Sequence, residues 1–174
     1  MTRDRIYLIG FMASGKTTVG RLLADDLERP FRDLDAEIER RTGKSVPEIF
    51  ADGGEQAFRR IEQEVLVEGG IDDRAVVATG GGTFCSEPTR TFMLQTGVTI
   101  WLHLPYSEVV RRVGPLGKRN RPLFRDQAQA RELFEHRLAA YALADIRVDL
   151  SGREEPADVA SHLAVRLREH MCGL

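Results

Sequence analysis

A glycine-rich segment close to the N-terminus, GFMASGKT, restricts the possible folds of this chain more than any other feature. Residues 10–17 match the pattern G-x-x-x-x-G-K-[ST] and lie between an apolar run and a segment of helical periodicity. The backbone N–H groups of such a loop, with the N-terminus of the helix that follows, surround phosphate oxygens. The segment therefore predicts a strand–loop–helix unit that binds nucleotide phosphates, in which Lys16 adds a positive charge and Thr17 can bind magnesium.

Five short apolar runs alternate with longer segments of helical periodicity, which is the pattern of a parallel sheet with crossover helices. Residues 1–174 contain no repeat and no linker that would divide them into two domains. We therefore expect one α/β domain of three layers, in which a five-stranded parallel sheet is flanked by helices. The expected strands are Arg5–Gly10, Phe31–Leu34, Ala75–Thr79, Val98–Leu104 and Ile146–Leu150, and the expected helices include Lys16–Leu27, Glu55–Val67, Tyr106–Val113, Ala128–Leu143 and Pro156–His170.

The composition argues against several classes of protein. A formal net charge of -2 offers no broad basic surface for nucleic acid or an anionic membrane. The apolar run at the N-terminus, about six residues long, is too short for a signal peptide or a membrane span. Cys85 and Cys172 are the only cysteines and suit neither a disulfide framework nor a zinc site. We expect a cytoplasmic monomer without a nucleic-acid or membrane partner.

Residues outside the loop distinguish among the classes of nucleotide-binding protein that carry it. A guanine-binding N-K-x-D motif is absent, because the only asparagine, Asn120, is followed by Arg121. Motor and transporter ATPases usually end a core strand with an acidic residue, whereas the apolar run 75–79 continues into three glycines at 80–82. The sequence therefore favours a small-molecule kinase over a guanine switch or a motor.

Two acidic residues, Asp33 and Asp35, follow the second apolar run. Residues two apart at the end of a strand share one face, so both carboxylates can point into the crevice at the carboxyl edge of the sheet. One carboxylate could then help to hold magnesium while the other accepts a proton from an acceptor hydroxyl. As an alternative, Asp35 could cap a helix that begins at Ala36, because aspartate is a favoured N-cap.

In this combination and order, the motifs resemble those of the shikimate kinase family, which belongs to the nucleoside-monophosphate-kinase-like P-loop group. The resemblance covers nearly the whole chain. It implies transfer of the ATP γ-phosphoryl group to the 3-hydroxyl of shikimate, a step of aromatic amino acid (chorismate) biosynthesis. A related kinase acting on gluconate and a non-catalytic ATP-binding regulator remain alternatives. The segments that carry the resemblance are GFMASGKTT (10–18), DLD (33–35), GEQAFRRIE (54–62), GGG (80–82), RPL (121–123), the arginine at 137 and RVDLSGR (147–153).

The resemblance also implies a role for each matching residue. Lys16, Asp35 and Arg121 would be catalytic, with Asp35 as the base, and Mg²⁺ would be held by Thr17 and, through water, by Asp33. The expected ATP-binding residues are Ala13, Ser14, Gly15, Lys16, Thr17, Thr18, Arg112, Arg121 and Arg153, with Arg112 and Arg153 beside adenine; the expected shikimate-binding residues are Asp35, Arg59, Gly80, Gly81, Gly82 and Arg137, with Arg59 and Arg137 at the carboxylate.

Two segments are expected to surround the substrates. Helices within about 35–68 would hold the acceptor. The run Gly114–Pro122 contains two glycines, two prolines and three cations, which is typical of an anion-facing loop. We therefore expect a mobile lid over about 114–125 that brings Arg121 to the phosphates, with Arg119 as the alternative residue for this role.

Some of these residues also have simpler interpretations. Arg59 and Arg60 lie in a segment of alternating charge and could form a solvated helix face. The glycines at 80–82 could be a turn that only ends a strand. Against this, the planar guanidinium of arginine suits a carboxylate, and successive glycines allow a backbone to approach a ligand closely.

Overall fold

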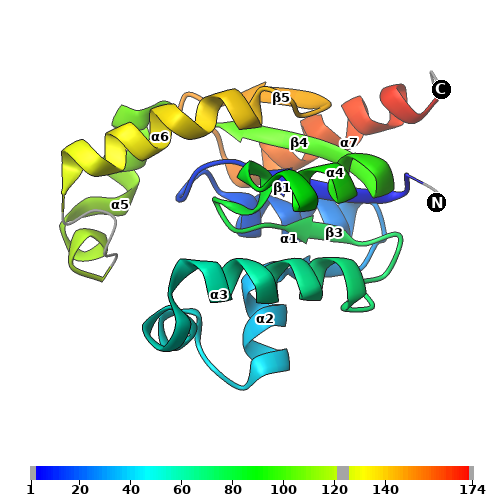
Figure 1. Cartoon of the computed structure of the whole chain (residues 1–174). Helices are drawn as coiled ribbons and strands as arrows, with labels where there is room; N and C mark the ends of the chain where they lie inside the picture. Colours follow the sequence, from blue (N-terminus) through cyan, green and yellow to red (C-terminus); the bar gives the residue numbers. More distant parts are fainter. Residues whose placement is uncertain (1–2, 121–125, 173–174) are drawn as a thin grey trace.

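The computed structural model describes residues 3–120 and 126–172 and forms one three-layer α/β unit (Figure 1). All five expected strands are present, each within about two residues of its expected ends. Within the described ranges, no helix has the length and apolar character needed to cross a membrane. The strands are β1 (Arg5–Ile9), β2 (Phe31–Asp33), β3 (Val76–Ala78), β4 (Gly97–His103) and β5 (Ile146–Asp149). The helices are α1 (Lys16–Asp26), α2 (Leu34–Thr42), α3 (Val46–Glu68), the 3₁₀ turn η1 (Thr83–Cys85), α4 (Glu87–Thr96), α5 (Tyr106–Asn120), α6 (Gln127–Tyr141) and α7 (Pro156–Cys172).

The five strands form one parallel sheet in the order β2-β3-β1-β4-β5. After β1 the chain builds the sheet on one side through β2 and β3, and then crosses to the other side to add β4 and β5. The carboxyl end of β1 is therefore a topological switch point, where open α/β sheets bind ligands. The loop at 10–17 follows β1 directly and lies at this point.

Helices cover both faces of the sheet. α1 packs against α7, and α3 packs against α2 and α4. Along the strand order, Figure 1 shows α2 and α3 together toward the end that contains β3, and α6 toward the other end, beside β4 and β5. The three central strands are buried on both faces, with Tyr7, Val77 and Ile100 fully enclosed. This burial explains why these strands appear in the sequence as continuous apolar runs rather than as alternating patterns.

The helical pattern of α3 is visible in the sequence only from Glu55, although the helix begins at Val46. Gly54 has φ 69° and interrupts the helical backbone, so two helical segments meet there. The first segment starts at a capping box, in which Ser45 and Glu48 bond to each other's backbone N–H groups. Helix α2 lies within the helical region expected over about 35–68, whereas the short helix α4 was not anticipated.

The expectation of a loop from Gly114 onward was wrong for residues 115–120, which continue α5. Gly114 itself departs from helical geometry, with φ 58° and ψ -178°, a conformation open almost only to glycine. The glycine therefore marks a break between two helical segments rather than the end of the helix. Arg121 and the rest of the expected lid, 121–125, lie outside the described residues, so the motion of the lid stays a prediction.

Candidate active site

The loop at 10–17 takes its shape from backbone conformations that few residues adopt. Gly10 and Gly15 have positive φ angles of 139° and 96°, and Ala13 has φ 60°. A side chain on Gly10 would overlap the carbonyl oxygen of Leu102 on β4, so this position has no room for a larger residue. The loop ends where α1 begins at Lys16, which directs the first N–H groups of α1 toward the concave side of the loop.

Lys16 is buried within this loop, and its ammonium group donates hydrogen bonds to the carbonyl oxygens of Gly10 and Phe11, both at 2.9 Å. Ser14 is also buried, and its hydroxyl has no hydrogen-bond partner among the described residues. The loop therefore places a fixed positive charge and a hydroxyl group next to the space that its N–H groups surround. Such an arrangement stabilises negative charge on phosphate oxygens.

Asp33 joins the end of β2 to the loop. One carboxylate oxygen, Oδ2, accepts a hydrogen bond from the Thr17 hydroxyl at 2.8 Å. The other oxygen, Oδ1, accepts bonds from the backbone N–H groups of Asp35 and Ala36 and so caps α2. The alternative that Asp35 caps this helix is therefore wrong, because α2 already begins at Leu34 and its N-cap is Asp33.

The pair formed by Thr17 and Asp33 suits the magnesium ion that the sequence predicts. A hydroxyl and a carboxylate oxygen lie within hydrogen-bond distance, and both are hard oxygen ligands of the kind that Mg²⁺ prefers. Among residues 3–120 and 126–172, no group of three or more His, Cys, Asp and Glu could hold a metal ion. A site with few protein ligands fits magnesium that is bound mainly through nucleotide phosphates and water.

Asp35 lies in the first turn of α2 and faces the same space. Burial raises its pKa from 3.8 to about 6, with further increases from the charges of Asp33 and Glu62 and an opposing effect from Lys16. Its Oδ1 atom is buried and has no hydrogen-bond partner among the described residues. A carboxylate with a pKa near 6 is ionised at neutral pH and is a better proton acceptor than an ordinary aspartate.

Arg59 on α3 lies against the glycine turn at 80–82. Its guanidinium group forms an ion pair with Glu62 at 2.7 Å and a longer one with Glu55 at 3.3 Å. The Arg59 side chain is 25% exposed and that of Glu62 is fully buried, whereas the neighbouring Arg60 is 76% exposed. The solvated-face interpretation therefore describes Arg60 and not Arg59. A side chain on Gly82 would overlap the guanidinium of Arg59 and displace it from the turn.

Arg137 approaches the same turn from α6. It lies in the buried stripe of that helix, between Phe134 and Tyr141, because residues three and four apart share one face. Its guanidinium carbon lies 5.6 Å from the centre of the Phe11 ring, and a side chain on Gly81 would begin 3.2 Å from its Nη1 atom. Two arginines from different helices, α3 and α6, thus converge on one glycine turn.

A cavity of about 350 Å³ connects the loop, the acidic residues and the glycine turn. Arg112 lies beside the loop and donates a hydrogen bond to the Ala13 carbonyl at 3.1 Å. Arg153 is exposed on the turn between β5 and α7 and does not line this cavity. The lining residues are Ala13, Gly15, Lys16, Thr17, Thr18, Asp33, Asp35, Thr79, Gly80 and Gly81.

Several residues of this region were not predicted from the sequence. Thr79 lines the cavity, and its hydroxyl donates to the Leu8 carbonyl of β1. Glu62 accepts a hydrogen bond from the Thr83 hydroxyl at 2.6 Å and so links α3 to the end of the glycine turn. The position of Glu62 three residues after Arg59 on an expected helix was an available signal for their ion pair. The partnership with Thr83 spans 21 residues and has no local signal.

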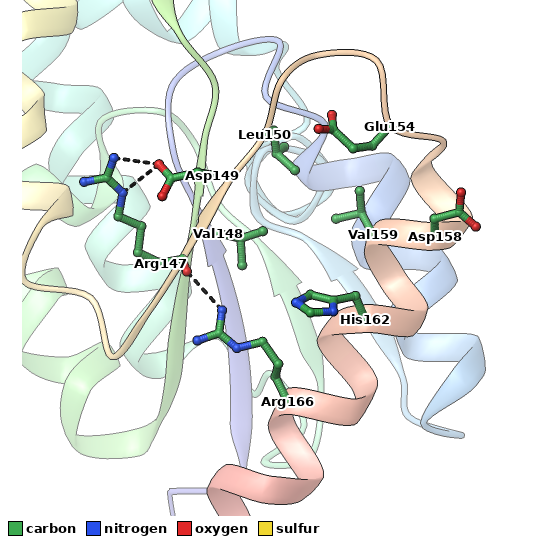
Figure 2. Close-up of a pocket in the computed structure, with 9 residues that line it drawn as sticks. All are labelled: Arg147, Val148, Asp149, Leu150, Glu154, Asp158, Val159, His162 and Arg166. Atoms are coloured by element: carbon green, nitrogen blue, oxygen red, sulfur yellow. Dashed lines mark hydrogen bonds and ion pairs between the residues drawn. The ribbon is translucent and has the colours of Figure 1, made fainter.

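A second cavity of about 360 Å³ lies between β5 and α7 and shares no lining residue with the first (Figure 2). Arg166 on α7 donates a hydrogen bond to the Arg147 carbonyl on β5, and the Arg147 side chain forms an ion pair with Asp149. The phosphate-binding loop and the two acidic residues Asp33 and Asp35 line the first cavity and not the second.

Comparisons with known proteins agree on one family. The family model described as shikimate kinase matches residues 12–168. The shikimate kinase of Synechococcus elongatus is 46% identical over 87% of this chain and 80% of its own length. The shikimate kinase of Aquifex aeolicus is 39% identical over 97% of this chain and 99% of its own length. The solved shikimate kinase of Acinetobacter baumannii in complex with shikimate is 36% identical and superimposes with a TM-score of 0.88, covering 97% of this chain and 95% of that one. This chain belongs to the shikimate kinase family.

Proposed function

We propose that this protein transfers the γ-phosphoryl group of ATP to the 3-hydroxyl of shikimate and so serves aromatic amino acid biosynthesis. The observation that carries this proposal is the convergence of three groups around one cavity and the adjoining turn. These groups are a phosphate-binding loop, the carboxylate of Asp35, and the guanidinium groups of Arg59 and Arg137. The family membership supports shikimate as the acceptor, because the superimposed Acinetobacter baumannii enzyme is a complex with shikimate.

In this mechanism the loop holds the phosphates of ATP, and Lys16 stabilises charge on the β- and γ-phosphate oxygens. Thr17 and, through water, Asp33 would hold Mg²⁺, which neutralises phosphate charge when it is bound. Asp35 accepts the proton of the acceptor hydroxyl while the oxygen of that hydroxyl forms a bond to the γ-phosphorus atom. The bond from that phosphorus to the β–γ bridging oxygen breaks, and ADP leaves. No covalent intermediate with the enzyme is needed.

Two arginines are proposed to hold the acceptor carboxylate. Arg59 is kept in place by the buried Glu62, so little of its side-chain entropy is lost when the carboxylate binds. Arg137 is fixed by its packing in the apolar stripe of α6. The glycine turn at 80–82 lies between them and allows the acceptor to approach the backbone.

The nucleotide is proposed to extend beyond the loop. Arg112 contacts the loop from α5, and Arg153 stands on the turn after β5, so adenine would lie between the two. Arg121, or Arg119 as its alternative, is proposed to reach the γ-phosphate from the lid. A monomeric state and a cytoplasmic location complete the proposal, and both rest on the sequence.

Replacing Arg59 or Arg137 with alanine should raise the KM for shikimate far more than the KM for ATP. The expected loss is about 2–5 kcal/mol of binding free energy, because the carboxylate would face an unpaired, partly desolvated site. Steady-state kinetics with each substrate varied in turn measure this effect. Arg60→Ala is the matched control, since Arg60 is exposed on the same helix and should leave both KM values unchanged.

A shikimate analogue whose carboxylate is replaced by a neutral amide should show the same loss with the wild-type protein. If the two alanine variants still discriminate fully against this amide, the arginines do not bind the carboxylate.

An ADP-release assay tests the function itself. The purified protein is supplied with ATP and Mg²⁺ and with shikimate, gluconate or a nucleoside monophosphate in separate reactions. Rapid ADP release is expected only in the reaction that contains shikimate as the acceptor. Release with gluconate instead would identify a different small-metabolite kinase, and ATP binding without release in any reaction would identify a non-catalytic regulator.

A further inference from the structure

Tyr141, the last residue of α6, connects two parts of the candidate acceptor site. Its side chain is almost fully buried, and its hydroxyl group donates a hydrogen bond to the carbonyl oxygen of Gly81. The guanidinium group of Arg137, one helical turn earlier on α6, lies close enough to this hydroxyl for its charge to oppose the rise that burial causes in the pKa of Tyr141. One buried hydroxyl thus lies between the glycine turn and the arginine that approaches it.

The position of the hydroxyl is set by packing. The Tyr141 ring packs against Trp101 of β4, with ring centres 5.8 Å apart. Phe134 belongs to the same buried stripe of α6 and precedes Arg137 by three residues. Its ring packs edge-to-face against that of Phe11, with ring centres 5.2 Å apart. These aromatic contacts fix α6 on the sheet, so the Tyr141 hydroxyl has little freedom to move away from Gly81.

The glycine turn needs such fixation. Three successive glycines have more accessible backbone conformations than any other tripeptide, so a turn made of them is not rigid by itself. On the side of α3, the Thr83 hydroxyl donates to the buried Glu62 and fixes the end of the turn. On the side of α6, the Tyr141 hydroxyl fixes the Gly81 carbonyl. The turn is therefore held by two helices, α3 and α6.

The Tyr141 hydroxyl is suited to act as a permanent donor. Burial raises the pKa of Tyr141 well above its usual range, and the charge of Arg137 opposes this rise only in part. The phenol therefore stays protonated over the pH range in which the protein works and keeps its proton for the Gly81 carbonyl.

We propose that Tyr141 is a positioning residue for the acceptor: its hydroxyl group holds the Gly81 carbonyl and the Arg137 guanidinium in the arrangement that receives the acceptor carboxylate and hydroxyl groups. This inference rests on the proposed function. Tyr141 acts through Gly81 and Arg137 and does not take part in the chemical step. Its loss should therefore affect acceptor binding and orientation, and leave the binding of ATP to the loop unchanged.

The test is a comparison of Tyr141→Phe with Tyr7→Phe. Tyr7 is also a fully buried tyrosine with a hydrogen-bonded hydroxyl, but its partner is Thr96, next to the amino end of β4, away from the cavity. Both variants lose one buried hydrogen bond and should lose similar stability in urea unfolding. Tyr141→Phe should raise the KM for shikimate about tenfold, lower kcat severalfold and change the KM for ATP less than twofold, whereas Tyr7→Phe should change none of these values.

A donor-restoring variant separates positioning from packing. Incorporation of p-aminophenylalanine at 141 keeps the ring and an N–H donor, and should return the KM for shikimate to within about twofold of the wild-type value. This variant also serves if Tyr141→Phe does not fold, because a tenfold higher shikimate KM despite the restored donor would overturn the proposal. Wild-type kinetics in Tyr141→Phe, or an equal rise in both KM values, would also overturn it. Failure of the wild-type protein to phosphorylate shikimate would instead contradict the proposed function.

Discussion

Lys16→Met is expected to abolish phosphoryl transfer, with a fall in kcat of at least about a thousandfold, while the protein stays folded. The ammonium group of Lys16 lies inside the loop, held by the carbonyls of Gly10 and Phe11 next to the surrounded space. Removing one preorganised donor from a developing negative charge typically costs about 10²–10³ in kcat, and a full positive charge in a buried site contributes more.

Lys44→Met is the matched control for this variant. Lys44 pairs with Asp52 at 2.8 Å, and its side chain is about half exposed and outside the cavity. The control should retain wild-type kcat, since Lys44 lies outside the cavity and its ion pair is exposed to solvent. Circular dichroism and urea unfolding show whether each variant is folded. Near-normal turnover by a folded Lys16→Met variant would contradict the assignment of the loop as the phosphate site.

Asp35→Asn is expected to lower kcat by about 10²–10⁴, the usual contribution of a positioned general base, with little change in ATP affinity. Because the pKa of Asp35 is raised to about 6, the wild-type kcat/KM for shikimate should fall as the pH is lowered through about 6. The fall follows protonation of the carboxylate that must accept the hydroxyl proton. If ATP binding is lost in Asp35→Asn while the kinetics of the acceptor persist, the roles of Asp33 and Asp35 are interchanged.

The same variant should be more stable than the wild type at neutral pH. Burial raises the pKa of Asp35 from 3.8 to about 6, so its ionised form costs free energy in the fold. This cost is absent below pH 4, develops as the pH rises to 6, and reaches at most about 3 kcal/mol above it. Asparagine removes the cost, so Asp35→Asn should gain stability in urea unfolding at pH 7.5 and show no such gain at pH 4.

Asp73→Asn provides the control for stability. The Asp73 side chain is 79% exposed, so its loss should change the unfolding free energy by less than about 1 kcal/mol at either pH. A decrease in stability for Asp35→Asn at pH 7.5 would show that the ionised carboxylate is well accommodated, and would contradict the raised pKa.

The elements that could be predicted from the sequence are those determined by residues close together in the chain. The buried strands appear as apolar runs because parallel strands are covered on both faces, and the loop at 10–17 is recognisable because its glycines, Lys16 and Thr17 are consecutive. Its position at the end of β1 follows from the same pattern. Asp33 and Asp35 were also found, although the structure assigns the helix cap to Asp33.

Contacts between distant parts of the chain could not be predicted in the same way. Arg59 and Glu62 are neighbours on one helix, but Glu62 also accepts a hydrogen bond from Thr83, which comes from another element. The hydrogen bond of Tyr141 with Gly81 spans 60 residues and depends on how α6 packs on the sheet. The continuation of α5 beyond Gly114 was missed because glycines and prolines usually end a helix, whereas here the helix resumes after a break.

Identification of the product by ³¹P and ¹H NMR, after the protein has reacted with ATP, Mg²⁺ and shikimate, tests the proposed function most directly. One phosphoryl group on the 3-hydroxyl oxygen of shikimate is expected for each ADP formed, with no product in the Lys16→Met variant. ADP formed without a phosphorylated acceptor, or an acceptor phosphorylated at another hydroxyl, would contradict it.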